Sequence, residues 1–485
     1  MEQKHNINEY EQARLEKREK LCELGVDPYG GKFPQAEPFD DISAKYDPEN
    51  EQQTVCGAGR IVLLRDIGKL IFITLRDQTG TIQTGLSKKL LGDQWPIAKL
   101  LDLGDIIGTE GMLGRTKTGE ITIWATGLTI LCKAILPPPE KWHGLQDVEL
   151  RYRRRYVDLF SNPDVMTTFV DRTAIIQTIR QFLQDRGFLE VETPMMQSIA
   201  GGAAARPFIT HHNSLDMDLY LRIAPELFLK RLLVGGMEKV FEINRNFRNE
   251  GISTQHNPEF TMCELYQAYA DYHDMMDLIE ELTCLLVQQR GTDMKLEFNG
   301  RTIDYSQPWQ RKTYAQLFAE HVGCEISDIA AVREKARQIE ISEANMDDTV
   351  VVNELFEHYV EDKLIDPTFV IDYPAALCPL TRRKADNPDI AERFELFVSS
   401  MEIANAYTEL NDPAVQEQNF RLQLRGQEET MATMDDDFVT ALKYGMPPAG
   451  GLGFGIDRLV MLLTNSASIR DVILFPLLRS QTGDS

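Results

Sequence analysis

Five strand-like runs in the first third of the chain restrict its fold more than any other feature. They are rich in β-branched residues, end at polar or glycine-containing turns, and span residues 55–64, 70–75, 81–86, 105–113 and 121–131. A short run with helical composition begins at Trp95, between the third and fourth strands. Five strands with a helix after the third is the order of the OB-fold, a small barrel that binds oligonucleotides on one face. We therefore expect an OB-fold at residues 51–135.

One face of this barrel has the side chains that single-stranded RNA requires. Phe72 and Gln83 lie on adjacent predicted strands, and Arg60 and Arg65 are near them. A ring can stack on a base, an amide can bond to a base edge, and a guanidinium can pair with phosphate. The alternative for Phe72 is a place in the barrel core, and alternation alone does not decide between the two.

The segments on either side of the barrel have a different composition. Residues 7–24 are rich in Glu, Lys, Arg and Leu and stop at a glycine, which predicts a helix within an N-terminal extension over residues 1–50. On the other side, Pro137-Pro138-Pro139 is the clearest domain break and predicts a linker over residues 136–160. The linker contains four arginines between 151 and 155, which are either an RNA contact or, more simply, intramolecular salt-bridge partners.

Residues 161–485 separate strands from helices instead of alternating them. Apolar residues recur at helical spacing in 168–186, residues 312–365 are mostly helical, and strand-like runs occur at 239–247, 258–269, 394–410 and 449–456. This pattern favours an α+β domain with an antiparallel sheet flanked by helices, in which 312–365 is a helical insertion.

Composition excludes several classes of protein. The net charge of −24 argues against indiscriminate nucleic-acid binding, although a local basic patch can still bind RNA. No run of about 18 apolar residues exists, and the first residues are polar, so we expect neither a membrane helix nor a signal peptide. The seven cysteines are scattered and form no CxxC pair, which argues against disulfides and a zinc site. We therefore expect a cytoplasmic protein.

Charged residues sit among hydrophobic ones around position 250. Alternation along a strand predicts that Arg248 and Glu250 point together, and that Glu264 and Tyr266 do the same. Charges in apolar surroundings are costly unless they are paired or used. We expect a hairpin that presents a cation, two carboxylates and a ring around one cleft.

A second acidic cluster lies between residues 395 and 409. Asn405, Tyr407 and Glu409 share a face if they belong to one strand, and Glu395 and Glu402 offer oxygen ligands for Mg²⁺. Glu402 has the wrong parity to share the face of Asn405, so this site requires a β-bulge.

A glycine-rich run, Gly450 to Gly455, precedes Asp457, Arg458 and an apolar helical stretch. Glycines allow close approach of a ligand to the backbone, and an arginine at a helix start can meet phosphate. The run lacks GxGxxG and the P-loop pattern, so neither of those nucleotide-binding modes is favoured.

These residues carry a family resemblance. Phe247–Glu250 with His256 and Phe260 resembles motif 2 of the class II aminoacyl-tRNA synthetases, Gly451–Arg458 resembles motif 3, and Gly187–Pro194 resembles motif 1. With the barrel in front, the chain resembles subclass IIb, the lysine, aspartate and asparagine enzymes. Gly201–Phe208, Ile223–Leu227 and Glu402–Asp412 are most similar to the lysine enzymes. Asp457 is a departure, because many class II enzymes have Glu there.

The resemblance implies a role for each matching residue. Arg248 and Arg458 would be catalytic. The other implied roles are ATP binding by Arg248, Glu250, His256, Phe260, Glu402 and Arg458; lysine binding by Gly202, Glu226, Arg248, Glu264, Tyr266, Asn405 and Glu409; Mg²⁺ binding by Glu395 and Glu402; and anticodon binding by Arg60, Phe72 and Gln83. The resemblance further implies a homodimer and tRNA(Lys), ATP and L-lysine as partners.

The acidic pocket independently favours lysine. A pocket for aspartate must supply cations, whereas Glu264 and Glu409 supply negative charge that suits an ammonium group. An aspartate or asparagine enzyme is therefore disfavoured. A paralogue that modifies a protein is disfavoured by the complete barrel. An inactive RNA-binding protein is disfavoured by the presence of Arg248, Glu250, Glu402 and Arg458.

Overall fold

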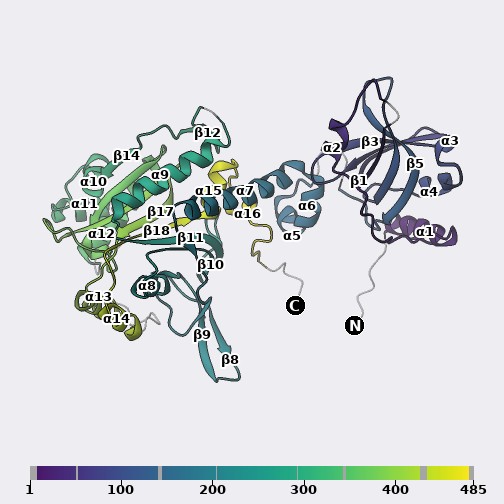
Figure 1. Cartoon of the computed structure of the whole chain (residues 1–485). Helices are drawn as coiled ribbons and strands as arrows, with labels where there is room; N and C mark the ends of the chain where they lie inside the picture. The colour runs from purple at the N-terminus through teal and green to yellow at the C-terminus, as the bar shows by residue number, and fades with distance from the viewer. Residues whose placement is uncertain are drawn as a thin grey trace. The chain divides into compact units, whose positions relative to one another are not determined.

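The structure is a computed structural model that describes residues 8–50, 53–139, 145–203, 205–291, 293–341, 346–425 and 434–479. The chain divides into two compact units, residues 1–166 and 167–485 (Figure 1). Residues 1–7 of the predicted extension and 140–144 of the predicted linker lie outside the described residues, as do 342–345 of the predicted insertion.

The first unit is built on a closed five-stranded barrel with strand order β1-β2-β3-β5-β4. Its strands are β1 Thr54–Asp66, β2 Leu70–Arg76, β3 Thr81–Ser87, β4 Ile106–Arg115 and β5 Ile121–Cys132. Its helices are α1 Glu9–Glu23, α2 Phe39–Ala44, α3 Lys88–Leu91, α4 Trp95–Ala98, α5 Val148–Arg153 and α6 Arg155–Ser161. Strands, order and helix position confirm the predicted OB-fold.

Three of the four arginines of the predicted linker belong to α5 and α6 and bind carboxylates of the same unit. Arg155 is buried 2.5 Å from Asp158 Oδ2, and Arg151 donates to Asp158 Oδ1 at 2.9 Å. Arg153 pairs with Glu149 at 2.6 Å. Three of the four arginines therefore serve as intramolecular partners, which favours the simpler of the two interpretations.

The second unit is built on an eight-stranded, mainly antiparallel sheet with strand order β14-β15-β16-β17-β18-β11-β10-β6. The strands are β6 Leu189–Glu190, β10 Lys239–Phe247, β11 Glu259–Ala268, β14 Gln310–Thr313, β15 Thr368–Pro374, β16 Ile390–Val398, β17 Met401–Thr408 and β18 Ala449–Gly455. Smaller sheets contain β7 Met196–Gln197, β8 Ile209–His212, β9 Met217–Leu221, β12 Lys295–Phe298 and β13 Arg301–Asp304. This architecture confirms the predicted α+β class.

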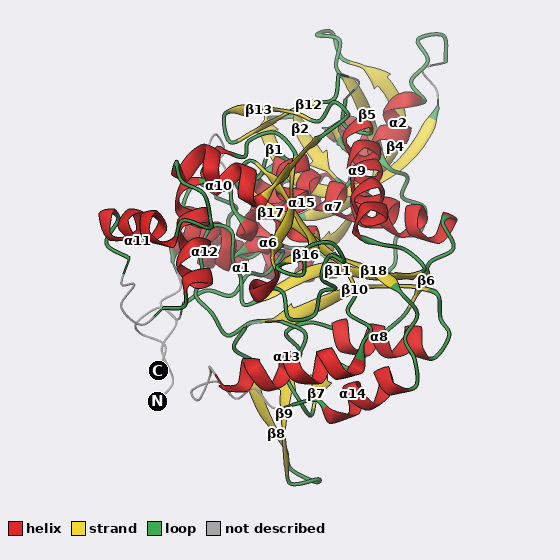
Figure 2. Cartoon of the chain, turned by 90° about the vertical axis from the view of Figure 1, so that its left-hand side faces the viewer, coloured by secondary structure: helices red, strands yellow, loops and turns green. Residues whose placement is uncertain are grey.

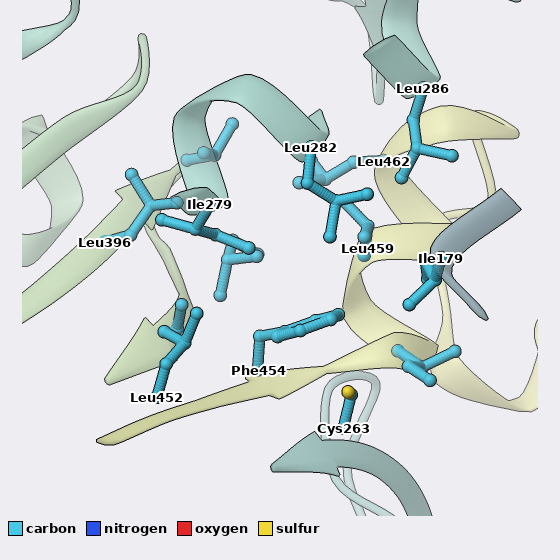
Figure 3. Close-up of a cluster of buried hydrophobic side chains, with 14 of the residues drawn as sticks. Ile179, Cys263, Ile279, Leu282, Leu286, Leu396, Leu452, Phe454, Leu459 and Leu462 are labelled. Atoms are coloured by element: carbon cyan, nitrogen blue, oxygen red, sulfur yellow. The ribbon is translucent and has the colours of Figure 1, made fainter. Parts of the chain in front are cut away.

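Helices cover the two faces of this sheet unequally. The helices are α7 Pro163–Asp185, α8 Glu226–Val234, α9 Tyr272–Gln288, α13 Pro413–Arg425, α14 Asp436–Lys443, α15 Ile456–Leu463 and α16 Ile469–Val472. Figure 2 shows α9 and α15 on one side of the sheet and α8, α13 and α14 on the other. On the first side, Cys263 and Phe454 of the strands meet Leu282 and Leu459 of the helices (Figure 3). That face is therefore the core, and the opposite face is available for a site.

The predicted strand-like run at 394–410 is wrong as a single strand. It forms the end of β16 and all of β17, joined by a tight turn at Ser399 and Ser400, whose φ angles are +52° and +62°. Such turns usually contain glycine or asparagine, so two serines give no turn signal in the sequence.

The helical segment predicted at 312–365 contains α10 Tyr314–Val322, α11 Ile329–Gln338 and α12 Asp348–Tyr359. These helices have a core of their own, in which the rings of Tyr314 and Phe356 stack at 4.0 Å. Across the described residues, no helix has both the length and the apolar composition needed to span a membrane.

Candidate active site

A cavity of about 440 Å³ opens on the face of the sheet that the core leaves free. Its floor is the glycine strand β18. Gly453 lies in register between Glu264 on β11 and Asn405 on β17, and Gly451 lies between Tyr266 and Tyr407. Because the two glycines have no side chain, the side chains of the flanking strands surround an empty space instead of filling it.

Twelve of the thirteen residues predicted for the site in this unit line the cavity. They are Gly202, Glu226, Arg248, Glu250, His256, Phe260, Glu264, Tyr266, Glu395, Glu402, Asn405 and Arg458. They come from separated parts of the chain, which the sheet order brings together. Glu409 is the thirteenth and does not line the cavity.

Arg248 and Glu250 reach the cavity from a loop and not from a strand, so the strand-alternation argument for them is wrong. β10 ends at Phe247, and the Arg248 amide donates to the Pro258 carbonyl at 2.9 Å, which closes the loop. The Arg248 guanidinium lies 5.2 Å from the centroid of the Phe260 ring. A flat ligand that stacks on Phe260 would therefore lie beside a cation.

Arg458 connects both sides of the cavity rim. Its Nη1 donates to the Glu402 carbonyl at 2.6 Å, and its Nη2 lies 3.1 Å from His256 Nε2. Burial and the charge of Arg458 lower the pKa of His256, so the imidazole is neutral near pH 7. The pair of Arg248 and Arg458 gives this end of the cavity the charge that phosphate requires.

Asp457, the departure from the usual motif 3 pattern, is a buried structural residue. It accepts the Thr261 amide at 2.7 Å and pairs with Arg172 at 2.7 Å. The shorter acid therefore uses both of its oxygens inside the fold, where it joins α15 to β11 and α7.

Glu395 and Glu402 approach each other because the expected β-bulge is present. Leu396 pairs with Ala404 and Phe397 pairs with Glu402, so β17 has one extra residue at this point. Burial raises the pKa of Glu395 to about 7; Arg393 opposes this shift, and the charge of Glu402 adds to it. Within the described residues no group of three metal-ligating side chains occurs, so a cation here would also need oxygen atoms from a substrate.

The other end of the cavity is acidic. Glu264 is buried, and its only hydrogen bond from a side chain in the described part of the structure is a long one from the Tyr266 hydroxyl, at 3.5 Å. Burial and the charge of Glu226 raise the pKa of Glu264 to about 8. A buried carboxylate without a cation is unfavourable, and a ligand that brings a cation would relieve it.

Glu409 lies behind this acidic end and pairs with Lys230, a fully buried lysine on α8. One of its oxygens is close to the cavity floor, because a Cβ built on Gly451 would meet Glu409 Oε1 at 1.9 Å. The glycine therefore gives space to the carboxylate, which packs beside the Tyr266 ring.

Sequence reasoning missed Arg393, which lines the cavity. It binds the Glu395 carboxylate and donates to Asn405 Oδ1 at 3.1 Å. Arg393 is two residues before Glu395 on β16, so strand alternation could have placed it on the same face. Lys230 was also missed, since it follows Glu226 by one helical turn in an apolar stretch that looks like core.

On the barrel, Phe72 faces away from the core formed by Ile71 and Ile73. Its ring contacts Trp124 edge-on at 5.9 Å, and the Arg65 guanidinium lies 5.4 Å from its centroid. This outward placement excludes the core interpretation for Phe72.

The other two predicted anticodon residues are already engaged within the unit. Gln83 donates to Thr122 Oγ1 at 2.8 Å. Arg60 donates to the Gly104 carbonyl at 2.8 Å and lies 4.6 Å over the Phe160 ring. Arg60 is therefore less available to RNA than the sequence suggests.

Trp124 is a second aromatic residue on this face that sequence reasoning missed. A Cβ built on Gly85 would meet its ring at 2.7 Å, and one built on Gly114 would meet it at 3.2 Å. The indole therefore lies across glycines of both neighbouring strands, beside Phe72. Its position on β5 alternates with buried residues, which is the signal that could have identified it.

Comparison with known proteins gives two family matches. Residues 147–479 match the model of tRNA synthetases class II (D, K and N), and residues 55–131 match an OB-fold nucleic acid binding domain of the tRNA anticodon type. The lysine–tRNA ligase of Carboxydothermus hydrogenoformans is 53% identical over 482 residues, which cover 98% of each chain. That of Pelotomaculum thermopropionicum is 53% identical over 98% of this chain and 96% of its own length. That of Syntrophomonas wolfei is 50% identical over 99% of both.

Proposed function

The chain belongs to the lysine–tRNA ligases, within the class II aminoacyl-tRNA synthetases, and from this premise we propose how its cavity activates lysine with ATP and passes it to tRNA(Lys). The observation that carries the proposal is Glu264, a buried acid that has no salt-bridge partner among the described residues and faces a glycine-floored cavity with arginines at its other end. Lysine supplies the missing cation, and ATP supplies the anion for the arginines.

Activation joins the two substrates without a protein nucleophile. A lysine carboxylate oxygen attacks the α-phosphorus of ATP, the bond to the bridging oxygen breaks, and pyrophosphate leaves. Arg248 holds the lysine carboxylate and the α-phosphate, and Arg458 holds the γ-phosphate. Arg458 is already held by the Glu402 carbonyl, and Arg248 already lies beside the Phe260 ring, so both cations can stabilise the charge of the transition state with little reorganisation.

The nucleotide is held along the rim formed by the loop after β10. Phe260 stacks on adenine, and Glu250 and His256 contact the nucleotide. Support comes from the position of the Phe260 ring beside Arg248 and from the place of His256 on the cavity rim next to Arg458. Asp457 takes no part, since its carboxylate is used inside the fold.

Lysine lies along the glycine strand. Glu226 and Gly202 receive its α-ammonium group, Asn405 its carboxylate, and Glu264, Tyr266 and Glu409 its side-chain ammonium. A neutral analogue would leave the buried acids unpaired, so the pocket can reject it strongly without an editing site. In the second step the 3′-terminal ribose hydroxyl of the tRNA attacks the carbonyl carbon of lysyl-adenylate, and AMP leaves.

Glu395 and Glu402 fit a Mg²⁺ ion that arrives with ATP. Both are hard oxygen donors, and their negative charges lie close enough to raise the pKa of Glu395. When bound, Mg²⁺ neutralises charge on the phosphates. Arg393 keeps Glu395 oriented from the protein side.

The barrel binds the anticodon, and Phe72 and Gln83 contribute to that surface, with a smaller part for Arg60. We keep the predicted limits of the extension (1–50), the barrel (51–135), the linker (136–160) and the catalytic domain (161–485) as part of this proposal. The seven free cysteines and the proposed substrates support a cytoplasmic location for the protein.

We also propose a homodimer. Val170, Leu189 and Met196 expose between 45% and 56% of their area near the motif 1 region of the second unit, and the edge strand β6 has a free side. Exposed apolar residues at a sheet edge are typical of an interface. Sedimentation of the full chain at micromolar concentration should give twice the 55.3 kDa chain mass.

The function is tested by lysine-dependent exchange of pyrophosphate into ATP, measured without tRNA for each of the standard amino acids. Exchange with lysine alone, followed by charging of tRNA(Lys), is the expected result. Exchange with aspartate or asparagine instead would contradict the assignment of the acidic pocket.

A further inference from the structure

Lys230 on α8 is a buried cation that no step described so far uses. Its side chain is 0% exposed, and its Nζ lies 2.6 Å from Glu226 Oε1, one helical turn earlier. Glu409, from the end of β17, contacts the same Nζ from the other side. Burial alone would lower the pKa of Lys230, but the charges of Glu226 and Glu409 outweigh it and raise the pKa, so the ammonium keeps its proton.

Each of these carboxylates gives one oxygen to Lys230 and keeps the other near the cavity. Glu226 Oε2 accepts from the Tyr407 hydroxyl at 3.3 Å and lies 3.8 Å from the Cβ position of Gly202, a cavity residue. Glu409 Oε1 fills the space over Gly451 beside Tyr266, two more cavity residues. The Lys230 ammonium therefore binds one oxygen of each carboxylate on the side away from the cavity, and the second oxygen of each carboxylate lies on the cavity side.

The formal charges at the acidic end of the cavity and on a bound lysine sum to zero only when Lys230 is included. Glu226, Glu264 and Glu409 bring three negative charges, and Lys230 and Arg248 bring two positive ones, which leaves one negative charge when all are ionised. Lysine, with two ammonium groups and one carboxylate, brings one positive charge. Without Lys230, one buried carboxylate would have no positive charge to balance it, and it would be expected to become protonated.

We infer that Lys230 is a positioning residue for the amino acid: acting through Glu226 and Glu409, it fixes the distance and orientation of the two carboxylates that receive the ends of the lysine substrate. The inference rests on the proposed roles of Glu226 and Glu409. It adds a specificity determinant that does not touch the substrate and acts on lysine binding, because its side-chain contacts with described residues, to Glu226, Glu409 and the Tyr407 ring, lie at the acidic end of the cavity.

The chain contains a matched control for a merely structural role. Lys133, in the first unit, is also 0% exposed and also sits between two carboxylates, Asp102 at 2.6 Å and Asp105 at 2.8 Å. Lys133 and both of these partners belong to the first unit, where they join the segment before β4 to the end of β5. Lys133→Met thus removes the same kind of buried cation from a place where no amino acid binds.

The test compares Lys230→Met and Lys133→Met in lysine-dependent ATP–pyrophosphate exchange, with the thermal midpoint of each variant as a check on folding. We expect Lys230→Met to raise the KM for lysine by about tenfold or more, the scale of a misplaced charged hydrogen bond, and to leave the KM for ATP within about twofold. Lys133→Met should lower the midpoint and leave both KM values unchanged. An unchanged lysine KM in folded Lys230→Met, or equal rises for lysine and ATP, overturns the inference.

A double variant covers the case in which Lys230→Met does not fold. Lys230→Met with Glu409→Gln removes one cation and one anion together, so the net charge of the buried cluster is unchanged and only Glu226 is left without its cation. Its reference is Glu409→Gln alone. We expect the double variant to have the higher lysine KM, because Glu226 also loses its partner; equal values overturn the inference. If wild-type protein shows no exchange with lysine, the proposed function fails, and not this inference.

Discussion

Glu264 on β11 lies directly opposite Gly453 on β18, and the next residue across the sheet is Asn405. The acid therefore has an empty space in front of it where most sheets would have a side chain. This relationship explains why a charged residue is tolerated in the middle of a buried strand, and it makes Glu264 the first residue to test.

Glu264→Gln should weaken lysine binding while the protein stays folded. The amide keeps the shape of the side chain but loses the charge that pairs with the ammonium group, a loss of about 1.5–3 kcal/mol, or about tenfold to hundredfold in the KM for lysine. Pyrophosphate exchange measures this change. Glu259→Gln on the same strand is the control, because Glu259 is half exposed and pairs with Arg245 outside the site; its lysine KM should not change.

Lysine binding should depend on pH between about 6 and 8. The pKa of Glu264 is raised to about 8 in the free protein, and only the ionised carboxylate pairs with an ammonium group. Below about pH 8, Glu264 must release a proton before it can pair with the lysine ammonium group. The KM for lysine should therefore fall by up to about tenfold for each pH unit as the pH rises, and it should become constant above about pH 8. A lysine KM that stays constant from pH 6 to pH 8, or that rises, contradicts this assignment. The Glu264→Gln variant should lose the part of this dependence that the titration of Glu264 causes.

Gly451→Ala and Gly453→Ala should separate two roles of the glycine strand. A methyl group at 451 would meet Glu409 Oε1 at 1.9 Å and the Tyr266 ring at 2.6 Å, so it must displace a buried ion pair. At 453 the closest atoms lie at 3.4 and 3.5 Å, an ordinary contact distance. We expect Gly451→Ala to lower the thermal midpoint and abolish lysine-dependent exchange, and Gly453→Ala to keep its midpoint. Similar midpoints for both variants would show that Glu409 does not need the space over Gly451.

Local patterns in the sequence predicted the helices and strands, whereas the order of the strands in the sheet determines which residues come together in the site. Strand-like runs in the sequence identified β10, β11 and β18 within a residue or two. Alternation also predicted that Glu402 needs a bulge, which is present. It failed at Ser399 and Ser400, since nothing in two serines indicates a turn with positive φ.

What the sequence could not predict is which groups inside the protein compete for the same charges. Glu409 was expected to face the substrate, but Lys230, 179 positions earlier in the chain (409 − 230), takes one of its oxygens. Arg60 was expected to face RNA, but Gly104 and Phe160 hold it. Such pairings depend on contacts between distant segments, and a residue's type and local period do not reveal them.

Phe72→Ala and Trp124→Ala should both impair charging of tRNA(Lys) and leave lysine-dependent pyrophosphate exchange intact. Phe72 points outward from the barrel, and the indole of Trp124 lies beside it across two glycines, so we expect the two rings together to be a platform for unpaired bases. Loss of one stacked base costs about 1–3 kcal/mol, which should raise the KM for tRNA by about tenfold or more. Trp124→Phe keeps a ring and should recover most of the charging activity. If exchange falls together with charging, the substitution has damaged more than the RNA surface; if charging is unchanged in Trp124→Ala, the platform consists of Phe72 alone.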